Sequence, residues 1–255
     1  MSLLVTEQLH VSIAQKKICE DLNVSIRSGE CWGLLGANGA GKTTLLYSLA
    51  GLRPVDSGQI LLKQKSIAAM TRREIAAVLG VLPQDSSDPF PANVFETVLI
   101  GRHPHLSAWQ WEGEQDFLLA HAALERVGMQ GFEKRQIDTL SGGERRRLAI
   151  ATLLIQQAPL MLLDEPTNHL DLRHQISMLS LLVETAGKAA GAVLMSLHDI
   201  NLAVRFCDHL LLLMPDGQVI QGTTNEMLDP EILQSLYDCP LRRIETEEGL
   251  VLLPE

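Results

Sequence analysis

The sequence predicts an α/β fold, in which a mainly parallel sheet is joined to an N-terminal antiparallel β subdomain and is interrupted by a helical insertion. Three observations support this prediction. Short, almost wholly apolar runs at 160–163 and 192–197 are typical of parallel strands covered on both faces. A glycine-rich loop at 36–43 lies between another buried strand and a helix. Strand signals vanish between about 88 and 158, where helical periodicity takes over.

The first third of the chain is rich in strand signals. Residues 1–30 alternate loosely between apolar and polar side chains, which predicts antiparallel strands ending at the turn Ser28-Gly29. A short strand follows the turn at 56–58, and a buried strand ends at Pro83 and Gln84. The strands expected here lie at 3–5, 9–13, 22–26, 31–35, 59–62 and 78–82.

The middle of the chain is expected to be helical, and strands are expected to return after it. The helical stripe there consists of Phe117, Leu118, Ala120, His121, Leu124 and Val127. After the two apolar strands, a hairpin is expected around Pro215-Asp216-Gly217, a last helix opens at Pro230, and short strands follow from Leu241. We therefore expect one domain over 1–255, with a core and β subdomain at 1–87 and 159–240, a helical subdomain at 88–158 and a tail at 241–255.

Composition limits the possible functions. The 255 residues are 46% hydrophobic and 20% charged, as in ordinary globular proteins. The net charge of −10 argues against a nucleic-acid surface, although the three arginines at 145–147 leave a local basic patch open. The four scattered cysteines suggest reduced thiols and neither a zinc site nor a redox motif. With no signal peptide and no apolar run near the ~20 residues that cross a bilayer, we expect a protein that is soluble by itself.

The run at 36–43 fits a glycine, four residues, then Gly-Lys-Thr, the pattern of a loop that cradles phosphates. A chance glycine-rich turn would not need the strand before it and the helix after it. Lys42 is expected to reach the outer phosphates, and the Thr43 hydroxyl to ligate Mg²⁺. Backbone N–H groups and the helix N-terminus complete the anion site. The predicted nucleotide contacts are Gly36, Asn38, Gly39, Ala40, Gly41, Lys42, Thr43 and Thr44.

Polar residues follow the predicted parallel strands at the edge of the sheet where ligands bind. Asp164 can hold Mg²⁺, and Glu165 can orient and deprotonate an attacking water; the alternative is a solvated acidic turn. His198 could contact the γ-phosphate, poise the water, or do both, or it could be purely structural. Gln84 could ligate Mg²⁺ or sense the γ-phosphate.

The run Ser141-Gly142-Gly143-Glu144 predicts a second phosphate site. Ser and Glu at this spacing form a capping box, so the run could simply start a helix. The two glycines argue for more, because they are poor helix formers and leave a helix N-terminus open to an anion. A nucleotide sandwiched between two copies of the chain would use both glycine-rich elements.

Together these residues resemble an ATP-binding cassette ATPase over essentially the whole chain. The six motifs stand in the family's order: residues 36–43, Gln84, residues 140–144, the strand ending at Asp164 with Glu165, a loop from Asn168 to Asp171, and His198. The resemblance implies a P-loop NTPase (RecA-like) core, ATP and Mg²⁺ as cofactors, and Glu165 as general base. It also implies a head-to-tail homodimer, in which each ATP lies between the phosphate loop of one copy and residues 141–144 of the other; Asp171 belongs to the same site.

Local runs at 101–105, 164–175 and 230–237 resemble the ATPases of iron-siderophore, haem and vitamin B12 importers. That resemblance implies a cassette dimer under two copies of an integral-membrane permease, fed by a substrate-binding protein, at the cytoplasmic face of the inner membrane and without nucleic acid. Residues 84–105 are the expected coupling surface. Trp109 and Trp111 could be core or could face the permease. The cargo stays open among haem, a ferric siderophore and cobalamin.

Two other functions are less consistent with the sequence. A soluble cassette acting on ribosomes or nucleic acid usually has two cassettes in one chain, long coiled coils or zinc modules, and this acidic chain has none of these signals. A small-molecule kinase with the same phosphate loop would leave residues 141–144 unexplained.

One departure from the family pattern leads to a prediction. Cassettes of this type usually carry an aromatic residue near the N-terminus that stacks on adenine, but here no aromatic residue precedes Trp32, and Ile13 occupies the expected place. Since apolar contact is less selective than stacking, we predict weak discrimination between ATP and GTP. Steady-state hydrolysis of the two nucleotides measures it, and a large preference for ATP would count against it.

Overall fold

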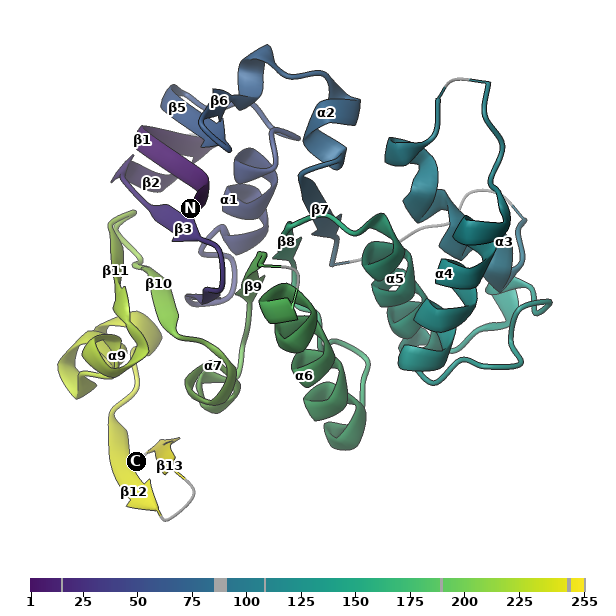
Figure 1. The fold of residues 1–255 in the computed structure, drawn as a ribbon. Coiled ribbons are helices and arrows are strands. Elements are labelled where there is room, and N and C mark those ends of the chain that lie inside the picture. Colours follow the sequence, from purple (N-terminus) through teal and green to yellow (C-terminus); the bar gives the residue numbers. More distant parts are fainter. Residues whose placement is uncertain (15, 85–90, 108, 189, 247–248, 255) are drawn as a thin grey trace.

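The computed structural model describes residues 1–14, 16–84, 91–107, 109–188, 190–246 and 249–254. An antiparallel sheet near the N-terminus lies beside a larger six-stranded sheet, and a group of helices follows the larger sheet on its other side (Figure 1). A two-stranded hairpin lies at the C-terminus. This arrangement confirms the predicted fold class.

The N-terminal sheet is built around one long strand, β1 (Ser2–Ile13). It pairs antiparallel with β2 (Lys16–Leu22), β3 (Ser25–Arg27) and β5 (Ser57–Leu62), and β5 pairs with β6 (Lys65–Ser66). The prediction of separate strands at 3–5 and 9–13 was wrong, because the chain continues through an irregularity at Gln8, whose φ is 45°. The strand expected at 22–26 is instead divided between β2 and β3, and β2 itself was not predicted.

The larger sheet has the strand order β11-β10-β4-β9-β8-β7. The strands β4, β7, β8, β9 and β10 run parallel to one another, and β11 pairs antiparallel with β10, which confirms the predicted hairpin. The bounds are β4 Cys31–Leu35, β7 Leu79–Leu82, β8 Leu160–Leu163, β9 Ala192–Ser196, β10 His209–Leu213 and β11 Val219–Thr223.

The two faces of this sheet contribute to different cores. On β8, Leu160 and Leu162 pack with the N-terminal sheet and α1 (Lys42–Leu49), whereas Met161 and Leu163 pack with the helices of the opposite face. All four side chains are buried. Burial on both faces explains why the parallel strands are uniformly apolar.

The insertion is helical, as predicted, in its described residues. Between 91 and 158 these form α3 (Val94–Leu99), α4 (Glu114–Arg126), α5 (Gly142–Gln156) and the 3₁₀ helices η2 (Ile100–His105) and η3 (Ile137–Thr139). The expected stripe was wrong at Phe117 and Leu118, which are 41% and 62% exposed, and at His121, which is also exposed. Leu118 lies on the face of α4 opposite Ala120 and Leu124, and Phe117 lies at the margin of the buried face.

The remaining helices cover the sheet and lead to the C-terminus. They are η1 (Ile67–Ala69), α2 (Arg72–Ala76), α6 (Leu172–Lys188), α7 (Ile200–Phe206), α8 (Thr224–Met227) and α9 (Pro230–Tyr237). The helix α9 and the strands β12 (Leu241–Thr246) and β13 (Gly249–Pro254) confirm the predicted end of the chain, whereas α2, α6, α7 and α8 were not predicted. In the described part of the chain, no helix is both long enough and apolar enough to cross a membrane.

The predicted subdomain boundaries stay predictions. The first boundary, at 87–88, lies outside the described residues. Residues 85–90 of the expected coupling surface at 84–105 also lie outside them.

Candidate functional site

A cavity of about 840 Å³ lies where the N-terminal sheet meets the glycine-rich loop. Loop residues and the start of α1 form one wall, and Ile13 of β1 lies on another. Residues from the ends of β7, β8 and β9 complete it, which brings Gln84, Glu165 and His198 together with the loop. Five segments that are distant in sequence thus meet at one cavity.

The glycine-rich loop connects β4 to α1, as predicted, and two of its glycines are required by close packing. A Cβ on Gly36 would lie 3.0 Å from the backbone oxygen of Leu213. Gly41 has φ 111°, and a Cβ there would lie 2.5 Å from the Cδ1 of Ile18. Larger residues would therefore push the loop away from the sheet and from β2. The start of α1, with Lys42, Thr43 and Thr44, lines the cavity, and an open helix N-terminus of this kind can bind an anion.

Lys42 is 6% exposed, and its side chain folds back along the loop. Its Nζ donates to the backbone oxygens of Gly36 at 2.8 Å and Ala37 at 3.2 Å. Burial lowers the pKa of Lys42, and the carboxylates of Glu165 and Asp164 oppose that shift. A phosphate bound in the cavity would add a further negative charge beside this buried ammonium group.

The carboxylate of Glu165 is the meeting point of the predicted strand-end residues. The Nε2 of Gln84 donates to its Oε2 at 3.0 Å, the amide of Asn168 donates to the same oxygen, and the His198 Nε2 contacts Oε1. The backbone of Glu165 is left-handed, with φ 49°, which is uncommon outside glycine. The structure therefore holds this carboxylate at the cavity through side chains from three strand ends.

Asp164 lies next to Glu165 and is 1% exposed. Its Oδ1 accepts a hydrogen bond from the Ser196 hydroxyl at 2.7 Å, whereas its buried Oδ2 has no hydrogen-bond partner among the described residues. A buried carboxylate oxygen without a partner is costly, and a cation bound through water would satisfy it. Thr43 and Gln84 line the cavity and Asp164 does not, but the side-chain oxygens of all three are donors of the kind that Mg²⁺ prefers.

Residues 141–144 form the capping box that the sequence predicts. The Ser141 hydroxyl caps α5, and the Glu144 carboxylate accepts from the Ser141 N–H at 2.8 Å and from Arg135 at 3.0 Å. The bond from the Ser141 N–H is the main cause that lowers the pKa of Glu144. None of the four residues is among those that line the described cavity. The two glycine-rich elements are thus separate within one chain.

The loop between β8 and α6 packs against this second element. A Cβ on Gly143 would lie 2.9 Å from the backbone oxygen of His169, whereas a Cβ on Gly142 would make an ordinary contact with the same residue. Packing within the chain is therefore an additional reason for Gly143. Asp171 is exposed, and its carboxylate accepts hydrogen bonds from the backbone N–H and the ring of His174; the backbone bond is the main cause that lowers its pKa.

Three residues at the site, Ser196, Asn168 and Arg146, were not among the predicted site residues, although Asn168 begins one of the six motifs and Arg146 lies in the basic run. Ser196 accepts from the Glu165 N–H at 2.8 Å, and Asn168 contacts the Glu165 carboxylate. The lone polar residue in an apolar strand could have pointed to Ser196. Arg146 is buried among backbone oxygens near the same carboxylate, and Arg145 and Arg147 also donate to backbone oxygens of their own subdomain. The basic patch that the run 145–147 left open is therefore not a free cationic surface.

Comparisons with known proteins identify the family. The family model described as ABC transporter matches residues 19–168. The iron(3+)-hydroxamate import ATP-binding protein FhuC of Bacillus subtilis is 38% identical over 93% of this chain and 88% of its own length. The hemin import ATP-binding protein HmuV of Bradyrhizobium diazoefficiens is 39% identical over 92% and 88%. The chain belongs to the ABC transporter family, as the resemblance of its motifs predicted.

Solved structures agree with this assignment. A chain from an inward-facing ABC transporter of the metal-chelate type is 30% identical, with a TM-score of 0.86, and the match covers 100% of this chain and 98% of that one. A nucleotide-free ATP-binding cassette from an ABC transporter, 23% identical with a TM-score of 0.78 over 92% and 98% of the two chains, shows the same fold.

The position of Lys42 leads to a prediction for nucleotide binding. Replacing Lys42 with alanine removes the buried ammonium group from the phosphate loop, so we expect ATP affinity to fall by about tenfold or more, as charge-assisted contacts are typically worth that much. Equilibrium titration with a fluorescent ATP analogue measures the effect. The exposed Lys63 lies on the turn between β5 and β6, away from the cavity, so Lys63→Ala is the control. Unchanged affinity in Lys42→Ala would be incompatible with the assigned role.

Proposed function

We propose that this chain hydrolyses ATP with Mg²⁺ in a homodimer that powers uptake of a metal chelate through a membrane permease. As a member of its family, the chain is an ATPase coupled to transport. One observation carries the proposed chemistry: the Glu165 carboxylate, held by Gln84 and His198, lines the same cavity as the phosphate loop. A carboxylate in this place can accept a proton from a water molecule that attacks the outer phosphate.

Each residue group has a distinct role in this proposal. The N–H groups of residues 38–44 and the Lys42 ammonium group bind the phosphates, and Ile13 contacts the base. The Asp164 carboxylate, the Thr43 hydroxyl and Gln84 hold Mg²⁺, which neutralises phosphate charge when bound. Glu165 orients the water and accepts its proton. His198, which contacts Glu165, keeps the carboxylate aimed at the outer phosphate.

The separation of the two glycine-rich elements supports the homodimer. Residues 141–144 present a capped helix N-terminus with little side-chain bulk, but they do not line the cavity of their own chain. Head-to-tail pairing would place this N-terminus from one copy against the outer phosphate in the other, with Asp171 at the same interface. ATP binding would then close the dimer, and hydrolysis would reopen it.

The names of the relatives support the importer class. They include import proteins for iron(3+)-hydroxamate, hemin and cobalamin, the last from Halobacterium salinarum at 37% identity over 90% of this chain. We propose a complex with two permease copies at the cytoplasmic face of the membrane, fed by a substrate-binding protein. An importer of metal chelates is therefore favoured over the alternative function, a soluble cassette acting on ribosomes or nucleic acid.

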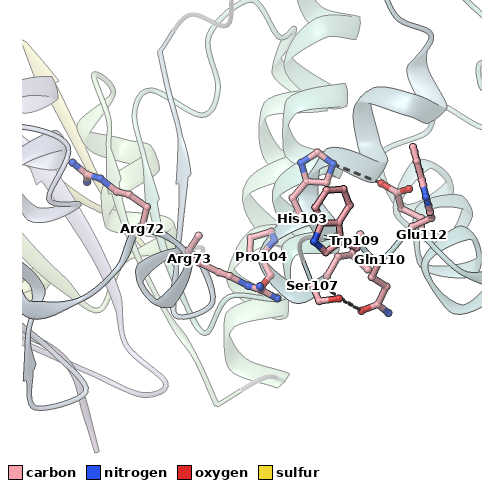
Figure 2. A pocket seen from close by; sticks show the side chains of 11 residues that line it. Arg72, Arg73, His103, Pro104, Ser107, Trp109, Gln110 and Glu112 are labelled. Atoms are coloured by element: carbon pink, nitrogen blue, oxygen red, sulfur yellow. Dashed lines mark hydrogen bonds and ion pairs between the residues drawn. The ribbon is translucent and has the colours of Figure 1, made fainter.

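A second hollow, of about 740 Å³, is the proposed permease-docking surface. It lies between α2 and the segment from η2 to α4, and Figure 2 shows Arg73 reaching toward Pro104, whose backbone oxygen it contacts at 3.1 Å. Trp109 and Trp111 on its rim are 95% and 85% exposed, which excludes the core as their place. Two exposed tryptophans beside cationic groups suit a partner protein. The residues from His103 to Glu112 that line this hollow follow Gln84 in the chain, and Gln84 lines the proposed nucleotide cavity. The proposed docking surface is therefore linked along the chain to the nucleotide site.

The role of Glu165 leads to a prediction about turnover. Glu165→Gln keeps the shape of the side chain but removes the proton acceptor, so we expect ATP to bind and hydrolysis to fall by roughly 100-fold or more. Without hydrolysis the closed dimer should accumulate. Steady-state ATPase assays and size-exclusion chromatography with Mg²⁺-ATP measure the two effects. Turnover at the normal rate would overturn the assignment of Glu165 as the base.

The proposed partner can be tested by affinity purification of the tagged protein from detergent-solubilised membranes, followed by mass spectrometry. We expect a polytopic permease in stoichiometric amount. We also expect the double variant Trp109→Ser, Trp111→Ser to lose the permease while it keeps its ATP affinity. The control is Leu253→Ser, which changes an apolar residue, 43% exposed, on the C-terminal hairpin. Recovery of ribosomal or DNA-associated partners alone would favour the soluble cassette instead.

A further inference from the structure

The side chain of Arg146 is unusual for the middle of a basic run, because it is 5% exposed. It extends from the first turns of α5 to the carboxyl ends of β7 and β8, and all three of its nitrogens donate to backbone oxygens there. The Nε donates at 3.3 Å to the backbone oxygen of Pro166, just past β8, and Nη2 donates at 2.7 Å to the backbone oxygen of Glu165. The oxygens that the guanidinium contacts belong to Pro83, Gln84, Asp164, Glu165 and Pro166.

These contacts hold the backbone that carries the proposed base. The oxygens of Asp164 and Glu165 stand on either side of the left-handed Glu165 residue, and the Glu165 N–H is held by Ser196 at 2.8 Å. A left-handed backbone in a residue other than glycine persists only where its surroundings fix it. Arg146 supplies charge-assisted hydrogen bonds to both flanking carbonyl groups, so it is a main source of that constraint.

The same guanidinium joins three parts of the proposed ATPase. Its Nη1 donates to the backbone oxygens of Pro83 and Gln84, where β7 ends. Its own backbone lies in α5, five residues after the Ser141 cap that would meet the nucleotide of the other copy. Only a planar group with several fixed donors can serve five acceptors on two strands at once.

We propose that Arg146 is a positioning residue for hydrolysis, which fixes Glu165 and links the N-terminal turn of α5 to the strand ends that carry Gln84 and Glu165. The inference rests on the proposed ATPase function. Arg146 does not touch the reacting atoms; it sets where the base stands relative to the phosphate loop, and it transmits a displacement of α5 to both strand ends. Loss of Arg146 should therefore slow hydrolysis far more than it weakens ATP binding.

The test compares Arg146→Gln and Arg146→Lys with the wild-type full-length chain. Glutamine keeps a single amide donor group, and lysine keeps the charge but offers one nitrogen. We expect kcat to fall roughly 10- to 100-fold in both variants, since small misplacements of a catalytic group cost that much. The dissociation constant of a fluorescent ATP analogue should stay within about twofold, because the phosphate loop is unchanged.

Arg147 provides the matched control. It lies next to Arg146 on α5, and its Nη1 donates to the backbone oxygens of Val127 at 3.1 Å and Gly128 at 2.8 Å, at the end of α4. Arg147→Gln removes the same kind of contact on the same helix, but away from the cavity. We expect a lower Tm in this control with kcat within about twofold of the wild type.

The outcomes separate this inference from the proposed function. A wild-type chain without ATPase activity, alone or with its membrane partner, would contradict the function itself. Normal kcat in both Arg146 variants, with kcat lost in Glu165→Gln, would overturn only the role of Arg146. Equal losses of kcat in the Arg146 and Arg147 variants, in step with Tm, would overturn it too, because they would show a merely structural effect. If Arg146→Gln does not fold, Arg146→Lys gives the kcat and binding values that decide.

Discussion

The site depends on the parallel register of three neighbouring strands. In that register Leu82 of β7 pairs with Leu163 of β8, and Leu163 pairs with Met195 of β9. Gln84 and Glu165 each follow two residues after a paired position, and His198 follows three residues after one. Their side chains therefore reach the same place without any long loop. A shift of one residue in any pairing would turn the alternating side chains to the wrong face of the sheet.

Burial explains why the polar groups at this edge form a connected set. Asp164 and Glu165 lie at the end of an apolar strand and are buried, so their backbone oxygens have little access to solvent. Ser196 and Arg146 provide most of the missing hydrogen bonds. The Oδ2 of Asp164 has no hydrogen-bond partner among the described residues, and a bound cation would satisfy it.

The helical insertion carries the second glycine-rich element, which does not line the cavity of its own chain. Its helix α5 carries the capped N-terminus that is proposed to meet the nucleotide of another copy, and the buried guanidinium of Arg146 ties the same helix to the strand ends of its own chain. Its exposed residues Trp109 and Trp111 line a separate hollow together with residues of α2. The insertion thus contacts the backbone of Asp164 and Glu165, and it carries both the proposed dimer interface and the proposed permease-docking surface. This arrangement suits a protein that converts its nucleotide state into motion of a partner.

The sequence by itself determined the fold class, the parallel strands and the glycine-rich loop between β4 and α1, because glycine spacing and uninterrupted apolar runs are local consequences of backbone and burial requirements. It also placed Gln84, Glu165 and His198 at strand ends. Only the tertiary structure decided that β1 is one strand, that Leu118 faces outward, and that Arg146 is buried rather than part of a basic patch. These features depend on which distant backbone groups need hydrogen bonds or close packing, and sequence spacing does not encode that need.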